Sequence, residues 1–421
     1  MHEITSILID LFIIFTAAKI AGALFTRLKQ PSIVGEVLAG VLIGPYLLGW
    51  VGTPNESFIH LFGGDEASAR TALTLTLDVL AELGVILLLF FVGLETRVSE
   101  LVKARGRALL VGGLGILFPF AFGFALMQWL GRTDLESAFV ATAMVSTSIG
   151  ITARVLGEIG VLRQREARII LGAAVVDDVL GLLLLSVVSS TAGGGVDIWQ
   201  LLLTVIEVVL FFVFVVLIGT RIVRRYSIRL ERAPFQNAPL FVTLVVMLGF
   251  SALAGAIGLA AIIGAFLAGL MLSEAKERYD LERQAKPIYE FLVPFFFVVT
   301  GTKVDLTAFR DPQVLGLALG VTALAIVGKL LGGGLASIGL PARSALVVGT
   351  GMTPRGEVGL VVASIGTGLG IISGDAFAAV VFMSLATTLL APPALVWLYR
   401  GRRTNLEESK KDGESRRDFH L

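Results

Sequence analysis

The sequence contains no cysteine and only three histidines, and these absences limit the chemistry that the chain can perform. Without cysteine, neither a disulfide framework nor a thiolate metal site can form. His2, His60 and His420 all lie outside the apolar runs. A histidine-based zinc site or catalytic triad in the apolar part of the chain is therefore excluded, and we expect no enzymatic activity and no cofactor.

Charged residues are also scarce. Aspartate, glutamate, lysine and arginine make up 16% of the 421 residues, whereas 55% are hydrophobic and the mean hydropathy is +0.87. This composition predicts a polytopic membrane protein, and the 48 glycines suit closely packed or interrupted transmembrane helices. The net charge of +1 gives no indication of nucleic-acid binding. The first apolar run, 4–25, can span a membrane and follows no basic segment, so we expect no cleavable signal peptide.

The apolar runs predict an all-α membrane protein with thirteen transmembrane helices. The predicted spans are 4–25, 33–50, 72–93, 108–130, 137–157, 168–190, 198–220, 237–256, 258–273, 287–302, 313–337, 342–369 and 375–399. Of the 34 lysines and arginines, 26 lie in connections after odd-numbered spans or in the C-terminal tail, and only four follow even-numbered spans. The positive-inside rule therefore predicts a multi-pass protein of the cell (inner) membrane with its N-terminus outside and its C-terminus cytoplasmic.

Two short motifs recur seven spans apart. The stretch 35–40 in span two is similar to 264–269 in span nine, and 90–98 at the end of span three is similar to 296–304 at the end of span ten. Because seven is odd, the two halves must have opposite orientations, which predicts an inverted repeat with span seven as the bridge. Inverted repeats are typical of transporters whose substrate site lies near the membrane midplane.

The same offset pairs span five with span twelve, and both are predicted to be broken. Span five has a hydroxyl cluster around Gly150, and span twelve contains Pro354, which removes a helix donor. Unwound backbone at that depth survives only against protein or a wet cavity, where its carbonyls and helix ends can bind a small cation. We expect breaks near 146–151 and 352–356, crossing beside Asp178.

Two adjacent carboxylates, Asp177 and Asp178, interrupt the apolar run 169–188 in span six. Charge at that depth is costly, and mid-membrane carboxylates usually mark an ion or proton path; a purely structural interhelical contact is the alternative. Lys329 lies in the middle of span eleven. We expect it to pair with an aspartate of span six, and snorkelling to an interface is the alternative.

Other polar residues of the spans have less certain roles. Thr147 and Ser148 can supply neutral oxygens to a cation or bond back to helix carbonyls. Arg355 and Glu357 are expected to form a structural charge pair in the second broken helix, and Lys303 is expected to be a surface charge because the repeat maps it to a span end. The sequence gives no partner for Glu36, Asp78, Glu82 and Glu207, of which Glu82 is the best candidate for lining a cavity.

Taken together, these motifs resemble those of the monovalent cation:proton antiporter-2 family. The matching segments are 31–40, 43–45, 82–84, 91–95, Ser146-Thr147-Ser148, Asp177-Asp178, Gly328-Lys329 and Pro354-Arg355-Gly356-Glu357. They occur in the family's order from about residue 4 to residue 399, and the set is specific although no single motif would suffice.

The resemblance implies the sodium/proton antiporter fold, a homodimer of scaffold domains with six-helix cores that contain two crossed broken helices. On that pattern the scaffold helices lie in 1–106 and 236–305, the core helices in 107–192 and 306–399, a linker helix in 193–235 and a cytoplasmic tail in 400–421. Paired aspartates with a core lysine resemble the electrogenic sodium/proton exchangers. Glutathione-gated potassium efflux relatives usually differ at the first aspartate and carry a cytosolic nucleotide-binding domain, which we do not expect after so short a tail.

The sequence therefore predicts a secondary active antiporter that exchanges sodium, or lithium, for protons at one site. We expect Asp178 to bind the cation or a proton, Asp177 to pair with Lys329 when no ion is bound, and both aspartates to ligate sodium with Thr147 and Ser148. Electroneutral exchange and potassium export stay open. An intramembrane aspartyl protease needs aspartates facing each other from different helices, and a non-transporting sensor would not need the inverted repeat.

Overall fold

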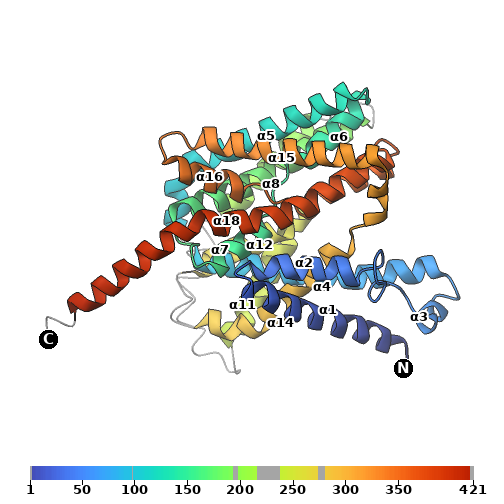
Figure 1. Ribbon diagram of the computed structural model, residues 1–421, viewed down its shortest axis with the longest axis horizontal. Coiled ribbons are helices and arrows are strands. Elements are labelled where there is room, and N and C mark those ends of the chain that lie inside the picture. The colour runs from blue at the N-terminus through green and yellow to red at the C-terminus, as the bar shows by residue number, and fades with distance from the viewer. Residues whose placement is uncertain (1, 97, 193–197, 216–237, 274–279, 418–421) are drawn as a thin grey trace.

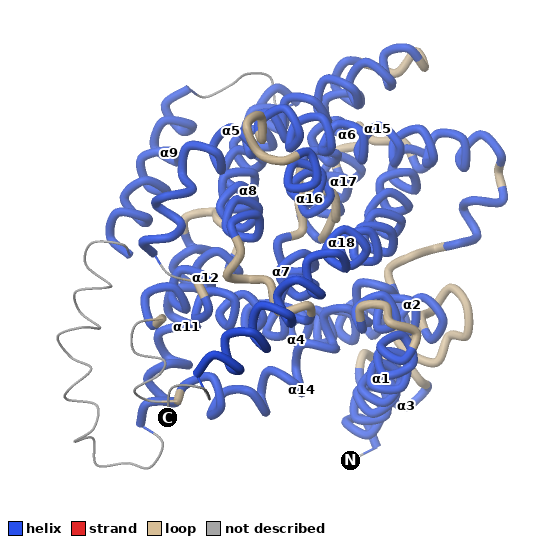
Figure 2. The backbone as a smooth tube through the Cα atoms, turned by 60° about the vertical axis from the view of Figure 1, so that its left-hand side comes forward, coloured by secondary structure: helices blue, strands red, loops and turns tan. Residues whose placement is uncertain are grey.

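The computed structural model describes residues 2–96, 98–192, 198–215, 238–273 and 280–417, and over these ranges it contains helices and loops but no strand (Figures 1 and 2). The unbroken helices are α1 (His2–Arg27), α2 (Ser32–Ile43), α4 (Glu66–Glu95), α5 (Val98–Trp129), α8 (Arg165–Ala192), α9 (Ile198–Val213), α11 (Ala238–Ala256), α12 (Ala261–Leu272), α14 (Leu281–Thr302), α15 (Pro312–Ala336) and α18 (Gly374–Arg417). Two helix pairs, α6 (Asp134–Val145) with α7 (Ile149–Glu158) and α16 (Ala342–Gly351) with α17 (Glu357–Gly368), are interrupted, and α3 (Glu56–Leu61) and η2 (Leu306–Arg310) are short.

The predicted all-α fold is confirmed. Among the described residues, eight helical segments are long and apolar enough to cross a membrane, and α2 and α12 are shorter apolar helices. Each predicted span coincides with a helix or with an interrupted pair, although span seven lies only partly within the described residues. Span two is shorter than predicted because α2 ends at Ile43, after which Gly44 and Pro45 begin a turn. α18 is longer than predicted and projects from the body of the protein (Figure 1).

Several helices begin where the sequence supplies a capping side chain. The Asp65 carboxylate accepts from the backbone N–H of Ala67 at the start of α4. The Asp311 carboxylate accepts from the N–H of Gln313 at the start of α15, where Pro312 occupies a first-turn position that needs no donor. These caps set the helix boundaries at the loops that the charge distribution predicts to lie outside.

The helices pack in two groups, which form the lower and upper parts of Figure 1. In the first group α4 packs on α12 and α14, α2 packs on α1 and α14, and α11 packs on α12. In the second group α5 packs on α6, α8 and α15, while α15 also contacts α16 and α18, and α17 lies on α6. α7 contacts α2 and α4 of the first group and α8 and α18 of the second. This half-helix therefore lies at the boundary between the two groups.

Glycine allows α2 and α14 of the first group to approach each other closely. A Cβ atom added to Gly40 would overlap the carbonyl oxygen of Val298 on α14. A Cβ added to Gly301 would in turn overlap the carbonyl oxygen of Val37 on α2. The crossing therefore depends on the absence of both side chains, as is common where membrane helices pack through small residues.

The crossing of α4 with α12 has the same construction. A Cβ on Gly93 would overlap the Phe266 carbonyl oxygen, and a Cβ on Gly269 would overlap that of Phe90. Because Gly40 and Gly269 close the two copies of the first motif, the two crossings are equivalent, and the predicted repeat is confirmed. The equivalence matches Gly93 of the first half with Gly301 of the second, whereas the alignment of 90–98 with 296–304 matches Gly93 with Val299.

Replacing Gly301 by alanine should destabilise the protein, because the new methyl group meets backbone that cannot move without separating α2 from α14. We expect the free energy of unfolding to fall by about 1–3 kcal/mol, seen as a lower unfolding temperature in detergent. Gly249→Ala in α11 is the matched control, since no atom lies within 4 Å of an added Cβ there. It should keep or slightly raise stability. Equal unfolding temperatures for the two variants would contradict the proposed close crossing.

Candidate ion-binding site

Both predicted helix breaks are present. α6 ends at Val145 and α7 begins at Ile149, while α16 ends at Gly351 and α17 begins at Glu357. The breaks lie within the predicted stretches 146–151 and 352–356. Each interruption leaves helix ends whose backbone groups have no partner within their own helix. In a membrane interior those groups must be satisfied by other parts of the protein.

The two breaks satisfy each other. The backbone N–H of Ser148 donates to the carbonyl oxygen of Pro354 over 2.8 Å, and the Thr147 hydroxyl donates to the carbonyl oxygen of Met352 over 3.1 Å. These bonds join residues more than 200 positions apart in the chain. The broken helices therefore cross as predicted, at a point defined by backbone atoms.

The hydroxyls of the first break are placed to act as neutral ligands. Thr147 donates its proton to Met352, so its oxygen lone pairs stay available to a cation. Ser148 is buried, and its hydroxyl has no hydrogen-bond partner among the described residues. It lies so close to Gly356 that a Cβ there would be 2.7 Å from the Ser148 oxygen. The hydroxyl that bonds back to a carbonyl of its own helix is that of Ser146, which donates to the Ala143 carbonyl oxygen over 3.4 Å.

The lysine of α15 contacts the first aspartate of α8. Lys329 Nζ lies 2.8 Å from Asp177 Oδ1, and both side chains are completely buried. The other oxygen of Asp177 has no hydrogen-bond partner among the described residues. Gly115 of α5 lies beside the lysine, at a distance where an added Cβ would be in van der Waals contact with Nζ at 3.5 Å. In a medium of low dielectric constant, each charge offsets part of the free-energy cost of burying the other.

Asp178 is buried as well, with 3% of its surface exposed. Adjacent residues point about 100° apart around a helix, so Asp178 faces a different direction from the aspartate that holds Lys329. α8 also packs against α6 and α16, the first halves of the two broken helices. One of the paired aspartates is thus held by the lysine, and the second lies on the same turn of α8, a helix that packs against both broken helices.

Arg355 binds backbone carbonyl oxygens near the second break. Its guanidinium is fully buried and donates to the carbonyl oxygens of Met352 and Thr353, both at 3.1 Å, and of Ala325 at 3.2 Å. It therefore places a positive charge at the C-terminal end of α16, where helix carbonyls carry partial negative charge. The side chain of Glu357 lies outside the described residues, so its pairing with Arg355 stays a prediction.

The structure also supplies partners that sequence spacing could not reveal. Glu36 of α2 lies 3.6 Å from Arg154 of α7, and Asp78 of α4 lies 2.8 Å from Lys303 at the end of α14. Lys303 is partly exposed, in keeping with a residue near the surface. Glu82 and Glu207 are exposed, and the cavity-lining role of Glu82 stays a prediction. Each of these ion pairs joins two helices, which leaves no periodic signal in the sequence.

A helical membrane protein with an internal repeat, two crossed broken helices and a buried aspartate–lysine pair belongs to the class of secondary transporters. The transmembrane sodium/hydrogen exchanger family model matches residues 13–401. The chain belongs to this family, which confirms the relationship that the sequence motifs predicted.

Relatives of known name cover nearly the whole chain. The high-affinity Na(+)/H(+) antiporter NhaS3 of Synechocystis is 36% identical over 95% of this chain and 91% of its own length. The Na(+)/H(+)-K(+) antiporter GerN of Bacillus cereus is 32% identical over 94% of this chain and 97% of its own. The solved structure of the sodium proton antiporter MjNhaP1 from Methanocaldococcus jannaschii has a TM-score of 0.63, covers 95% of this chain and 98% of its own, and supports the fold alone at 17% identity.

Replacing Lys329 by methionine should destabilise the protein strongly, because Asp177 is then a buried charge without its partner. We expect a loss of about 3–5 kcal/mol, most of it recovered when Asp177→Asn is added. The unfolding temperature of the purified protein and its double-mutant cycle measure this coupling.

Lys303→Met is the matched control. The ion pair of Lys303 with Asp78 has the same 2.8 Å separation, but the two side chains are 44% and 38% exposed. Its loss should cost only about 0–1 kcal/mol. Similar losses for the two lysine variants would mean that burial does not set the strength of the Lys329 pair.

Proposed function

We propose that the chain is a secondary active antiporter that exchanges sodium, or lithium, for protons by alternating access at one site. The observation that carries this proposal is the buried Asp177–Lys329 pair beside Asp178 at the crossing of two broken helices. Relatives at 32–36% identity that are named Na(+)/H(+) antiporters support the choice of ions. The transport cycle needs no cofactor and no catalytic residue.

Asp178 is the shared binding group for sodium and protons. A carboxylate binds a hard cation such as sodium through oxygen, and protonation removes the charge that holds the cation. Occupancy by one ion therefore excludes the other, which couples the two fluxes without any further device. Thr147 and Ser148 complete the sodium site with neutral oxygens, and Asp177 becomes a ligand once it is released from Lys329.

Charge bookkeeping favours electrogenic exchange. With both aspartates ionised and Lys329 charged, the empty site carries −1, and it stays at −1 when sodium enters and Lys329 gives up its proton. Returning with one proton on Asp178 and one back on Lys329 gives 0, so the two half-cycles differ by one charge. Arg355 adds the same fixed charge to both half-cycles and does not change the difference.

The proposed arrangement in the membrane follows the two helix groups. The scaffold comprises 1–106 and 236–305, the core comprises 107–192 and 306–399, the linker helix lies in 193–235 and the tail in 400–421. The packing of α1, α2, α4, α11, α12 and α14 in one group supports this division. The proposed protein is a homodimer in the cell membrane. Its N-terminus lies outside, an orientation that the uneven distribution of lysine and arginine supports.

Potassium is the second candidate ion, because GerN, at 32% identity, is named as an Na(+)/H(+)-K(+) antiporter. Electroneutral exchange is the alternative to the charge count above. Proteoliposome flux measured with Na⁺, Li⁺ and K⁺ supplied in turn distinguishes the ions. Proton movement driven by sodium or lithium but not by potassium is the result expected here.

Asp178→Asn should abolish sodium-driven proton movement and leave the folded protein intact, because the amide neither carries the charge nor exchanges a proton. The measurement is sodium-driven pH change in proteoliposomes, with the unfolding temperature as a check on folding. Asp305→Asn is the control, since Asp305 caps the short helix η2 and asparagine caps equally well. A wild-type exchange rate in the Asp178 variant would place the site elsewhere.

Lys329→Gln should weaken or remove the dependence of transport on membrane potential, because the lysine can no longer give up its proton when sodium enters. Sodium-driven pH change is measured in liposomes with and without a potential clamped by K⁺ and valinomycin. Wild-type exchange that ignores the potential would refute electrogenic transport. A fully electrogenic Lys329 variant would refute the role of the lysine and leave exchange itself unaffected.

A further inference from the structure

The far end of the half-helix α7 carries a polar cluster that the exchange mechanism above does not use. Arg154 Nε donates to Glu158 over 2.8 Å, within α7 itself. Its Nη1 donates to the Tyr289 hydroxyl of α14 over 3.0 Å, and its Nη2 donates to the Ser32 hydroxyl of α2 over 3.3 Å. Nη2 also lies 3.6 Å from the carboxylate of Glu36. One guanidinium thus joins three helices that are distant in the chain.

Glu158 adds a second connection between α7 and α2. One carboxylate oxygen accepts from the backbone N–H of Ser32 over 3.1 Å, and the other accepts from the Ser32 hydroxyl. Ser32 is the first residue of α2, and Pro31 before it provides no side-chain cap. The carboxylate of another helix therefore caps α2, at the end where unpaired N–H groups attract negative charge.

Most of this cluster is shielded from solvent. The Glu36 and Arg154 side chains are 5% and 15% exposed, and that of Glu158 is 26% exposed. One oxygen of Glu36 has no hydrogen-bond partner among the described residues. Partly buried charges of this kind bind each other more strongly than surface pairs, because less water competes for them.

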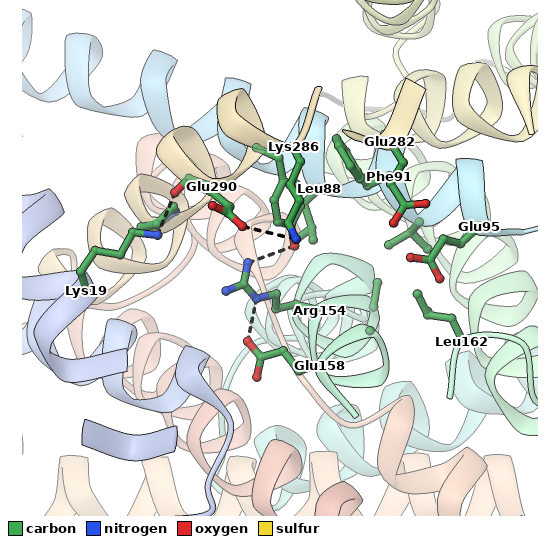
Figure 3. A pocket seen from close by; sticks show the side chains of 15 residues that line it. Lys19, Leu88, Phe91, Glu95, Arg154, Glu158, Leu162, Glu282, Lys286 and Glu290 are labelled. Carbon is green, nitrogen blue, oxygen red and sulfur yellow. Dashed lines mark hydrogen bonds and ion pairs between the residues drawn. The ribbon is translucent and has the colours of Figure 1, made fainter. Parts of the chain in front are cut away.

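Two cavities flank the cluster, one on each side of Glu158. The first, of about 570 Å³, is lined by Arg154, Glu158 and Tyr289 together with residues of α1, α4 and α14 (Figure 3). The second, of about 560 Å³, is lined by Ser32 and Glu158 together with residues at the end of α1 and in the middle of α18. The contact between α7 and α2 therefore separates two hollow regions at the boundary of the helix groups.

The position of α7 connects the cluster to the proposed ion site. The half-helix has 10 residues and begins directly after Ser148, whereas Arg154 and Glu158 lie toward its other end. A helix of that length is rigid and spans about 15 Å. Alternating access requires one helix group to move against the other. A bond from α7 to α2 and α14 must then break during the cycle, unless it lies at the pivot.

We propose that Arg154 and Glu158 are positioning residues that latch α7 to Ser32, Glu36 and Tyr289, and that this latch opens and re-forms in every transport cycle. The proposal rests on the proposed exchange function, because only a moving core requires such a contact to open. When the latch is closed it holds the hydroxyls of the first break in place. When it opens, α7 moves with the second helix group and the two cavities join.

The absence of native cysteine allows a direct test. In the double variant Ser32→Cys, Glu158→Cys the only two thiols lie across the proposed latch, where a short reducible bis-thiosulfonate reagent can join them. Cross-linking should lower sodium-driven proton movement by about tenfold or more, and reduction should restore it, because a locked conformational step stops turnover. Unchanged transport by the cross-linked protein would overturn the latch and leave the exchange function standing.

The matched control is the double variant Asp78→Cys, Lys303→Cys. These residues also form an ion pair between two helices, but α4 and α14 belong to the same group. Cross-linking this pair should leave transport within about twofold of the untreated rate. An equal block in both double variants would mean that the reagent, rather than the latch, stops transport, and would overturn the proposal.

A second measurement covers a double variant that folds poorly or is inactive before cross-linking. Glu158→Gln keeps the shape of the side chain and removes its charge, and Glu158→Asp restores the charge. A latch predicts a change of about threefold or more in maximal rate for the glutamine variant, measured well below its unfolding temperature, and partial rescue by aspartate. A rate that stays at the wild-type value there, or a changed rate that aspartate does not bring back toward wild type, would overturn the proposal.

Discussion

The ion pair between Lys329 and Asp177 governs how the second helix group can be built. Both side chains are completely buried, so each supplies the counter-charge that water would otherwise provide. α8 and α15 both pack against α5 in this group. Asp178, the neighbouring carboxylate, lies on another face of the same helix turn. The pair thereby commits one of the two adjacent aspartates to an ion pair.

The two broken helices solve a related problem for the backbone. Ending a helix in the membrane interior leaves carbonyl and N–H groups that must find partners. Ser148 and Thr147 satisfy groups of the opposite break, and Arg355 satisfies three carbonyls at once. The same unwound segment carries the hydroxyls of Thr147 and Ser148, which the proposed exchange function uses as sodium ligands.

Contacts within the first helix group differ from the contacts that cross the boundary. Close glycine crossings of α2 with α14 and of α4 with α12 bind the first group through backbone contact, which permits little relative movement. Across the boundary, α7 is held by charged side chains that flank two cavities. Side-chain bonds can exchange partners, whereas interlocked backbones cannot. The proposed alternating access, in which the second helix group moves against a rigid first group, needs both kinds of contact.

Features that depend on local composition could be predicted from the sequence. Apolar runs predicted the spans, Pro354 and the hydroxyls near Gly150 predicted the breaks, and the cost of an isolated charge predicted a partner for Lys329. Three further features became visible only in the folded chain: Arg355 binds carbonyl oxygens, the repeat matches Gly93 with Gly301, and Glu36 meets Arg154. These contacts join helices far apart in the chain, so their geometry depends on how the groups pack and not on any spacing along the sequence.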